Sequence, residues 1–358
     1  MDFGQNDSGV EPMGPESPQP APLSAEATPS TEKKPSKGTG WRIFWGVVLA
    51  LSVLANIALF TMLVLVSMAA VYGLGQKDIV AEEVIQKGPR TKKIAVIGVQ
   101  GVIDDERARE VCQQLKLARE DRRVKGVIVR VNSPGGTISG SDEIYNEILK
   151  YRDKETEDKP AVAFMQGVAA SGGYYTSVAC NKIVAEPTTI TGSVGVIVGY
   201  LVLQQLLEEK LGIQPVIIKS AEKKDWPSSF QAPTEEQLQY IEEKLIRPAH
   251  SRFVEVVAEG RTPLLTLADV ERLADGSIYG AEEAYEEKLI DEIGYMDEAI
   301  EEVMSLAELD EAQVVEYRKP FSLAGLLSSQ SASLLKIDKS MLYDLSTPQL
   351  LYLWTIHE

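Results

Sequence analysis

A continuous apolar stretch near the start of the chain interrupts a largely polar background. Residues from Ile43 to Gln76 carry no charged side chain. At 1.5 Å rise per residue a helix of that length reaches about 50 Å, against about 30 Å of hydrocarbon in a bilayer. The pattern predicts one membrane-spanning helix, assigned to residues 41–76. The Pro-, Ser- and Glu-rich tail before it, residues 1–40, is expected to be disordered.

Charges on the two sides of the predicted span are unequal. Lys33, Lys34, Lys37 and Arg42 come just before it, whereas acidic residues dominate soon after Lys77. By the positive-inside rule the N-terminal tail lies in the cytoplasm and the rest of the chain lies outside it. A cleavable signal peptide is the alternative, but its apolar region would be shorter and closer to the N-terminus. We favour a single-pass anchor in the cell (inner or cytoplasmic) membrane.

Beyond the span, short β-branched runs alternate with segments of helical periodicity. Strands are expected at Ile94–Val99, Val127–Val131, Ala161–Met165, Ile183–Ala185, Ser193–Val198 and Val216–Ile218. Helices are expected at Glu106–Glu120, at Ser141–Arg152, and from a capping box at Thr234 toward Gly260 with a bend near Pro248. This alternation predicts an α/β domain over residues 77–315 with a largely parallel sheet.

The composition limits the classes of function. With 358 residues and 44% hydrophobic content the chain can bury a substantial core, and its net charge of -17 argues against nucleic-acid binding. The two cysteines, Cys112 and Cys180, are too few for a disulfide framework and lack metal-ligand spacing. The sequence has no phosphate-binding loop or cofactor fingerprint, so we expect neither a metal nor a cofactor.

A serine in a small-residue turn is the leading candidate for catalysis. Ser171 follows an apolar strand and precedes Gly172 and Gly173. Glycines at these positions cost helix stability but permit close access, which is unusual for a serine that only caps a helix. Neither His250 nor His357 lies in a segment that suits a Ser-His-Asp arrangement. A lysine is therefore the expected base.

Two further loops carry residues that would complete such a site. A buried strand is followed by Asn-Ser-Pro-Gly-Gly at 132–136, which either aims backbone N–H groups at an oxyanion or forms a simple tight turn. In a later turn, Ser193 either hydrogen-bonds a buried amine or satisfies the turn itself. The candidate bases are Lys219, Lys223 and Lys224, and their chemistry alone does not choose among them.

Taken together and in this order, these motifs resemble the signal peptide peptidase A family in its short, membrane-anchored bacterial form. The resemblance extends from about Lys93 to Gly294. It implies a crotonase-like and Clp-protease-like fold, a repeated ββα superhelix, with a Ser-Lys dyad and no cofactor. The implied site residues are Ser171 as nucleophile, Lys224 as general base, Ser193 as the hydroxyl that orients the lysine, and Gly135, Gly136 and Gly172 around the oxyanion. The sequence departs from the family pattern at Asp275–Glu282, a segment that contains none of these catalytic positions.

The resemblance also implies a function and an assembly. The chain would be a membrane-anchored serine endopeptidase that degrades signal peptide remnants. It would form a homo-oligomeric ring in which a neighbouring protomer contributes the lysine. An octamer is one possible size of this ring. A crotonase-type acyl-CoA enzyme and an inactive membrane scaffold of the same fold are the alternatives. For the C-terminal tail, residues 316–358, surface docking is the simpler expectation and entry into the active-site groove is the other.

Overall fold

The computed structural model describes residues 38–73, 80–153, 159–318 and 349–354. The chain divides into two units, residues 1–77 and 78–358. The predicted disordered tail, 1–40, lies outside the described residues except for 38–40. Of the C-terminal tail, 316–358, only residues 316–318 and 349–354 are described.

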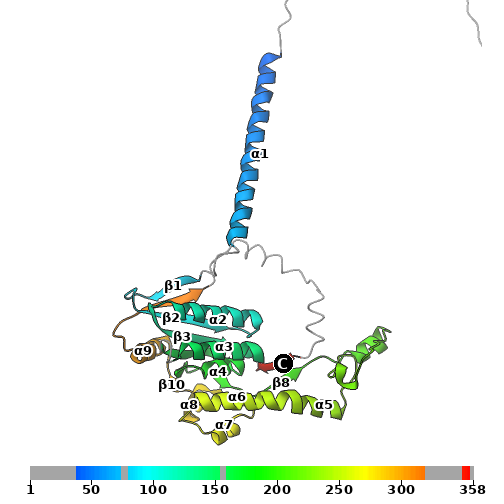
Figure 1. The fold of residues 1–358 in the computed structure, drawn as a ribbon, viewed down its shortest axis with the longest axis vertical. Helices are drawn as coiled ribbons and strands as arrows, with labels where there is room; N and C mark the ends of the chain where they lie inside the picture. Colours follow the sequence, from blue (N-terminus) through cyan, green and yellow to red (C-terminus); the bar gives the residue numbers. More distant parts are fainter. Residues whose placement is uncertain (1–37, 74–79, 154–158, 319–348, 355–358) are drawn as a thin grey trace, which may run out of the picture. The chain divides into compact units, whose positions relative to one another are not determined.

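The described part of the first unit is one long helix, α1 (Thr39–Gly73), shown alone in blue in Figure 1. Its segment Gly40–Met68 has a mean hydropathy of 2.5 and no buried residue in the most apolar window. A helix that is apolar all round suits lipid, because its backbone groups are already hydrogen-bonded within the helix. This confirms the prediction of a helix that is long and apolar enough to cross a membrane.

The second unit is built on a mixed sheet. Within the described residues its nine strands are β1 (Ala81–Gln86), β2 (Lys93–Gln100), β3 (Val124–Ser133), β5 (Ala161–Ala170), β6 (Lys182–Ala185), β7 (Ile190–Gly192), β9 (Ile278–Gly280), β10 (Glu292–Ile293) and β11 (Gln313–Arg318). The strand order is β1-β11-β2-β3-β5-β6-β10, and β7 pairs with both β5 and β9. The pairings β1–β11 and β7–β9 are antiparallel and the others are parallel. The predicted α/β class and largely parallel sheet are confirmed.

A small second sheet lies beside the ends of the parallel strands. It consists of β4 (Gly135–Thr137), β12 (Gln349–Leu353) and β8 (Ile197–Gly199) in that spatial order, with both pairings antiparallel. The central strand comes from the C-terminal end of the chain, shown in red in Figure 1.

Helices cover the main sheet and connect its strands (Figure 1). The α-helices of the second unit are α2 (Asp105–Glu120), α3 (Ile138–Tyr151), α4 (Gly172–Ser177), α5 (Glu235–Ile241), α6 (Arg247–Gly260), α7 (Leu267–Leu273), α8 (Ala281–Glu286) and α9 (Met296–Leu306). Short 3₁₀ or π turns occur at η1 (Leu206–Lys210), η2 (Glu222–Asp225) and η3 (Glu242–Ile246).

The sheet is buried on both faces because its central strands are apolar on both sides. Along β2, Ala95, Ile97 and Val99 belong to a large core cluster that includes residues of α2, α3, α4 and α6. The alternating residues Ile94 and Val96 belong to a second cluster that includes residues of α9. The continuous β-branched runs in the sequence therefore reflect burial on two faces.

Two of the expected strands are wrong in detail. The strand expected at Ser193–Val198 is divided, because β7 ends at Gly192 and β8 begins only at Ile197. The segment expected at Val216–Ile218 is not a strand, and the side chains of Val216 and Ile218 are 82% and 95% exposed. β-branched residues favour extended backbone, but a strand also needs a neighbour, and the described chain supplies none here.

The long helix expected from Thr234 toward Gly260 is present with a local change of pitch. Thr234 and Gln237 form the predicted capping box at the start of α5. The π turn η3 then joins α5 to α6, directly before Pro248 in the first turn of α6. Because proline has no N–H for an i→i−4 hydrogen bond, the irregular turn falls just N-terminal to it.

Candidate active site

Ser171 lies at a strained turn between β5 and α4. Its φ and ψ are 53° and -116°, a conformation that non-glycine residues rarely adopt. The backbone N–H donates to the Gly192 carbonyl at 2.8 Å, and the carbonyl accepts from the Tyr175 N–H at 2.8 Å. The Ser171 side chain makes no capping hydrogen bond to α4, so the alternative of an ordinary N-cap serine is wrong. Strained backbone of this kind clusters at active sites, ligand clamps and switch regions.

The glycine loop after β3 packs directly on the start of α4. Gly135 has φ +102°, and a Cβ built there would lie 2.7 Å from the Gly172 N atom. A Cβ on Gly172 would lie 2.4 Å from Ser141 Oγ and 3.2 Å from the Gly136 N atom. A Cβ on Gly136 would lie 2.1 Å from the Ile103 carbonyl oxygen, so close approaches restrict all three positions to glycine. The structure thus brings the backbone of Gly172 against that of Gly135 and Gly136 at one end of the parallel strands, where the Gly135 N–H donates to Ser133 Oγ at 3.1 Å.

Ser193 is close to this turn through the backbone. It follows Gly192, whose carbonyl accepts from Ser171, and it has φ 51°. Its N–H donates to the Ser277 carbonyl at 2.7 Å, and the residue is 7% exposed. The turn is therefore satisfied by the backbone, which leaves the hydroxyl available for another group. Its role in orienting a lysine stays a prediction.

The lysine-rich loop is distinguished by the partners of its three lysines. Lys219 pairs with Asp225 at 2.8 Å, and the Lys223 amine lies over the rings of Trp226 and Tyr240, 5.1 and 4.6 Å from their centroids. The Lys224 side chain is exposed on η2 and has no ion pair or ring contact within the described residues. Within this single chain no hydrogen bond between described residues joins Lys224 to Ser171, so the dyad also stays a prediction.

The strand β12 lies across the glycine loop, a feature that the sequence analysis did not predict as a strand. Tyr352 is opposite Gly136 and Leu353 is opposite Gly135 in the antiparallel register. The Trp354 N–H donates to the Pro134 carbonyl at 2.8 Å, and the Tyr352 carbonyl lies against Gly135, 2.0 Å from where its Cβ would be. The short continuous apolar run Leu350–Trp354 after Pro348 was the signal that could have revealed this strand.

The Tyr352 side chain fills an aromatic pocket next to the candidate nucleophile. It is fully buried against Tyr175 and Phe253, with ring centroids 5.1 and 4.6 Å away, and its hydroxyl donates to the Ala249 carbonyl at 2.7 Å. Burial raises the pKa of both Tyr352 and Tyr175, and a hydrogen bond from Tyr175 to Asp142 at 2.7 Å raises the second further. Both phenols therefore stay neutral donors at ordinary pH.

Two cavities lie on either side of β12. One of about 410 Å³ is lined by Ser193, His250, Asp275, Leu353 and Trp354 among others. The other, of about 560 Å³, is lined by Leu350 together with residues of α3, Tyr175 and Arg252. Cavities of this size match those that hold peptide side chains or small ligands. The described residues contain no group of His, Cys, Asp and Glu side chains that could hold a metal ion.

Comparison with known proteins identifies the family. The sequence matches Peptidase family S49 over residues 153–310 and Clp protease over residues 81–189. Both matched ranges contain Ser171, and the second explains the Clp-protease-like α/β fold.

Three relatives illustrate the extent of the similarity. A protein of Enterococcus faecium named as a signal peptide peptidase SppA is 39% identical over 67% of this chain and 71% of its own length. A protein of Synechocystis sp. named as a protease is 36% identical over 64% of this chain and 81% of its own length. Protease 4 of Haemophilus influenzae is 33% identical over 60% of this chain but only 35% of its own length. With the Ser171 turn and the glycine loop inside the matched region, the chain belongs to peptidase family S49 and is a serine peptidase.

Proposed function

We propose that this chain is an endopeptidase that degrades signal peptide remnants with a Ser171–Lys224 dyad. The observation that carries the proposal is the position of β12. A peptide segment already lies antiparallel to Gly135 and Gly136, with the Tyr352 carbonyl packed against Gly135 beside the Gly172 N atom. Peptidases commonly bind substrates as an added strand, since main-chain hydrogen bonds hold any sequence while pockets read alternate side chains.

The proposed reaction follows from these positions. The neutral Lys224 amine accepts the Ser171 proton as Oγ attacks the scissile carbonyl carbon. The backbone amides around Gly135, Gly136 and Gly172 stabilise the oxyanion that forms. The leaving amine takes the proton from the lysine, and an acyl-enzyme remains. Lys224 then activates water, which releases the second product and restores the serine.

Assembly would bring the base to the nucleophile. Lys224 is exposed, whereas Ser171 is 1% exposed, and Figure 1 shows the segment between β8 and α5 projecting beyond the sheet. The same segment exposes apolar side chains, including Leu211, Ile213 and Val216. Burying these against a second copy would remove unfavourable apolar surface from water. We propose a homo-oligomeric ring, with an octamer as one size, in which each Lys224 reaches Ser193 and Ser171 of a neighbour.

Membrane attachment would place the site near its substrates. The apolar helix α1 supports a membrane-anchored protein. We propose a single span in the cell (inner) membrane with a cytoplasmic N-terminus and an external peptidase domain, from the positive charges before the span. Digestion of the domain by protease added to the cytoplasmic side of sealed vesicles would contradict this orientation.

A mixing experiment tests both the dyad and its sharing between subunits. Ser171→Ala and Lys224→Ala proteins should each lose at least about 10³-fold in peptide hydrolysis, since the two groups act as a unit. When the two inactive proteins are co-expressed, sites that combine the intact serine of one subunit with the intact lysine of another should restore part of the activity. Lys223→Ala is the matched control and should remain active.

The alternatives predict different results. If both single variants are inactive and their co-expression restores no activity, the serine and the lysine of one site come from the same subunit. Full activity of either single variant would reject the dyad. The acyl-CoA alternative has no support from the peptidase family match. Absence of labelling at Ser171 by a serine-directed phosphonate, in an assembled sample, would favour the inactive scaffold.

A further inference from the structure

A polar cavity lies at the opposite end of β3 from the candidate active site. It has a volume of about 530 Å³ and is lined by Arg122, Lys125, Lys159, Pro160 and residues 306–308. Lys125 lies at the beginning of β3, whereas Gly135 follows its last residue. Ten strand residues extend about 30 Å. The cavity therefore does not belong to the site formed by Ser171 and the glycine loop.

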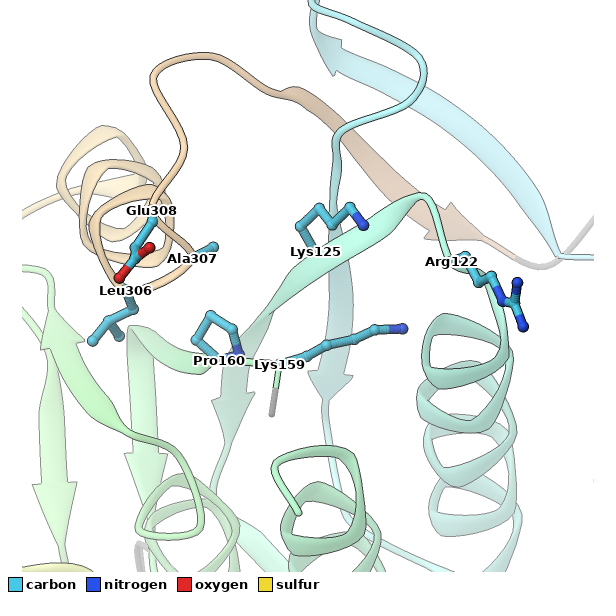
Figure 2. Close-up of a pocket in the computed structure, with 7 residues that line it drawn as sticks. All are labelled: Arg122, Lys125, Lys159, Pro160, Leu306, Ala307 and Glu308. Carbon is cyan, nitrogen blue, oxygen red and sulfur yellow. The ribbon is translucent and has the colours of Figure 1, made fainter. Parts of the chain in front are cut away.

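One wall of this cavity is cationic. Figure 2 shows Lys125 and Arg122 near the beginning of β3 and Lys159 just before β5, on the side nearer to α2. Lys159 is only 7% exposed, and its Nζ donates to the Arg119 carbonyl at 2.8 Å and the Asp121 carbonyl at 3.3 Å. These bonds hold its positive charge in a fixed position in the wall.

Two cations of this wall, Arg122 and Lys125, differ from the arginines beside them. Arg119 pairs with Glu147 at 3.1 Å, and Arg123 pairs with Asp121 at 2.9 Å. For Arg122 and Lys125, by contrast, no carboxylate of the described chain lies within ion-pair distance. In a protein with net charge -17, unneutralised cations gathered at a concave surface are unusual.

The opposite wall of the cavity is negatively charged. It is formed by the end of α9, residues 306–308, where the helix dipole places partial negative charge. Glu308 adds a full negative charge there, and its φ is 53°. Figure 2 shows Glu308 on the α9 side, with Pro160 between it and Lys159. Pro160 and Leu306 supply the apolar surface between the two charged walls.

A simple anion would meet attraction from one wall and repulsion from the other. A ligand with separated charges of both signs and apolar side chains between them would match both. We propose that this cavity binds a short peptide, with its C-terminal carboxylate at Lys125 and Arg122 and its N-terminal ammonium at Glu308 and the end of α9. The volume suits such a ligand, because small-molecule sites occupy about 300–1,000 Å³.

Calorimetric titration of the full chain in lipid nanodiscs tests the proposal. The protein carries Ser171→Ala so that added peptide is not hydrolysed, and the probe is the dipeptide alanyl-leucine. The Lys125→Gln and Glu308→Gln variants should each weaken binding about two- to fivefold, the loss expected for one exposed ion pair. N-acetylation or C-terminal amidation of the probe should weaken binding to a similar degree.

Matched controls keep these results specific. Lys150→Gln and Glu301→Gln remove exposed charges of the same kind, the second from α9 itself, but from residues that do not line the cavity. They should leave the affinity unchanged. Inorganic phosphate or the N-acetylated dipeptide binding as tightly as the free dipeptide would overturn the proposal in favour of a simple anion site. Dipeptide affinity that neither Lys125→Gln nor Glu308→Gln changes would place the binding elsewhere and overturn it as well.

Discussion

The ring of Tyr352 stacks on the ring of Tyr175 with centroids 5.1 Å apart and an interplanar angle of 26°. Tyr175 lies one helical turn after Ser171, whose carbonyl accepts its backbone N–H. The contact therefore joins the C-terminal strand β12 to the helix that begins at the candidate nucleophile. A residue far from Ser171 in sequence thus packs against the helix that follows Ser171.

Removing β12 should make the site more accessible to added peptide. A chain that ends at Pro348 loses the strand that pairs with Gly135–Thr137, so a competing segment disappears. If that segment fills nine-tenths of the sites, KM for a fluorogenic peptide falls about tenfold with kcat unchanged. A chain that lacks only residues 357–358 retains β12 and serves as the control. A KM that does not change on truncation would show that β12 does not compete with substrate.

Adding a methyl group at Gly135 should abolish most of the activity. Its φ of +102° disfavours any side chain, and the new Cβ would meet the Tyr352 carbonyl and the Gly172 amide. Gly135→Ala should displace the loop and reduce kcat by about 10²- to 10³-fold, the loss typical of one oxyanion donor. Gly280→Ala, where a Cβ meets no atom within 4 Å, should keep normal kcat. Equal rates for the two variants would argue against an oxyanion role for this loop.

A buried ion pair should be important for stability but not directly for chemistry. Arg261 is 3% exposed and contacts both carboxylate oxygens of Asp291, at 2.8 and 3.2 Å, while its Nε donates to the Lys288 carbonyl. Asp291 also accepts from the Ile183 N–H at the start of β6. Arg261→Leu leaves the carboxylate buried without its cation, so the free energy of unfolding should fall by about 3–5 kcal/mol.

Chemical denaturation measures this change directly. Arg272→Leu is the matched control, because its pair with Glu287 is exposed to solvent and should contribute little to stability. A similar loss in both variants would mean that burial does not determine the strength of the Arg261 pair.

Burial of Cys180 should make stability depend on pH in the alkaline range. Burial raises the pKa of this thiol from 9.0 to about 12. Below pH 9 the thiol is protonated in both the folded and the unfolded chain, and its contribution is complete. Between pH 9 and about 12 only the unfolded chain ionises, so the unfolding free energy falls by up to about 1.4 kcal/mol per pH unit.

The contribution of Cys180 is measured by comparing how steeply the free energy of unfolding falls with pH in the two proteins, with and without this thiol. Cys180→Ala lowers stability at every pH but should give a shallower fall above pH 9, because the titrating group is absent. Urea denaturation at pH 8, 9 and 10 measures the slope in both proteins. Identical slopes would show that Cys180 titrates alike in the folded and unfolded chain.

Local sequence was sufficient for the parts of the protein whose burial repeats along the chain. The uncharged run after Ile43 gave the apolar helix, and the short apolar runs gave β2, β3, β5 and β6, because each side chain there has the same kind of environment as its neighbours along the chain. The pair of glycines after Ser171 indicated a site where backbone and ligand come close. The order of the motifs indicated the family.

Only the tertiary structure decided which distant segments meet. Gly135 and Gly172 are 37 positions apart, yet the pairing of β3 with β5 places their backbones in contact. Tyr352 reaches the same place from the far end of the chain, and Val216–Ile218 resembles a strand but has no partner strand among the described residues. Sequence periodicity reports whether a side chain is buried but not what buries it, since pairing across a sheet depends on chain topology rather than on local preference.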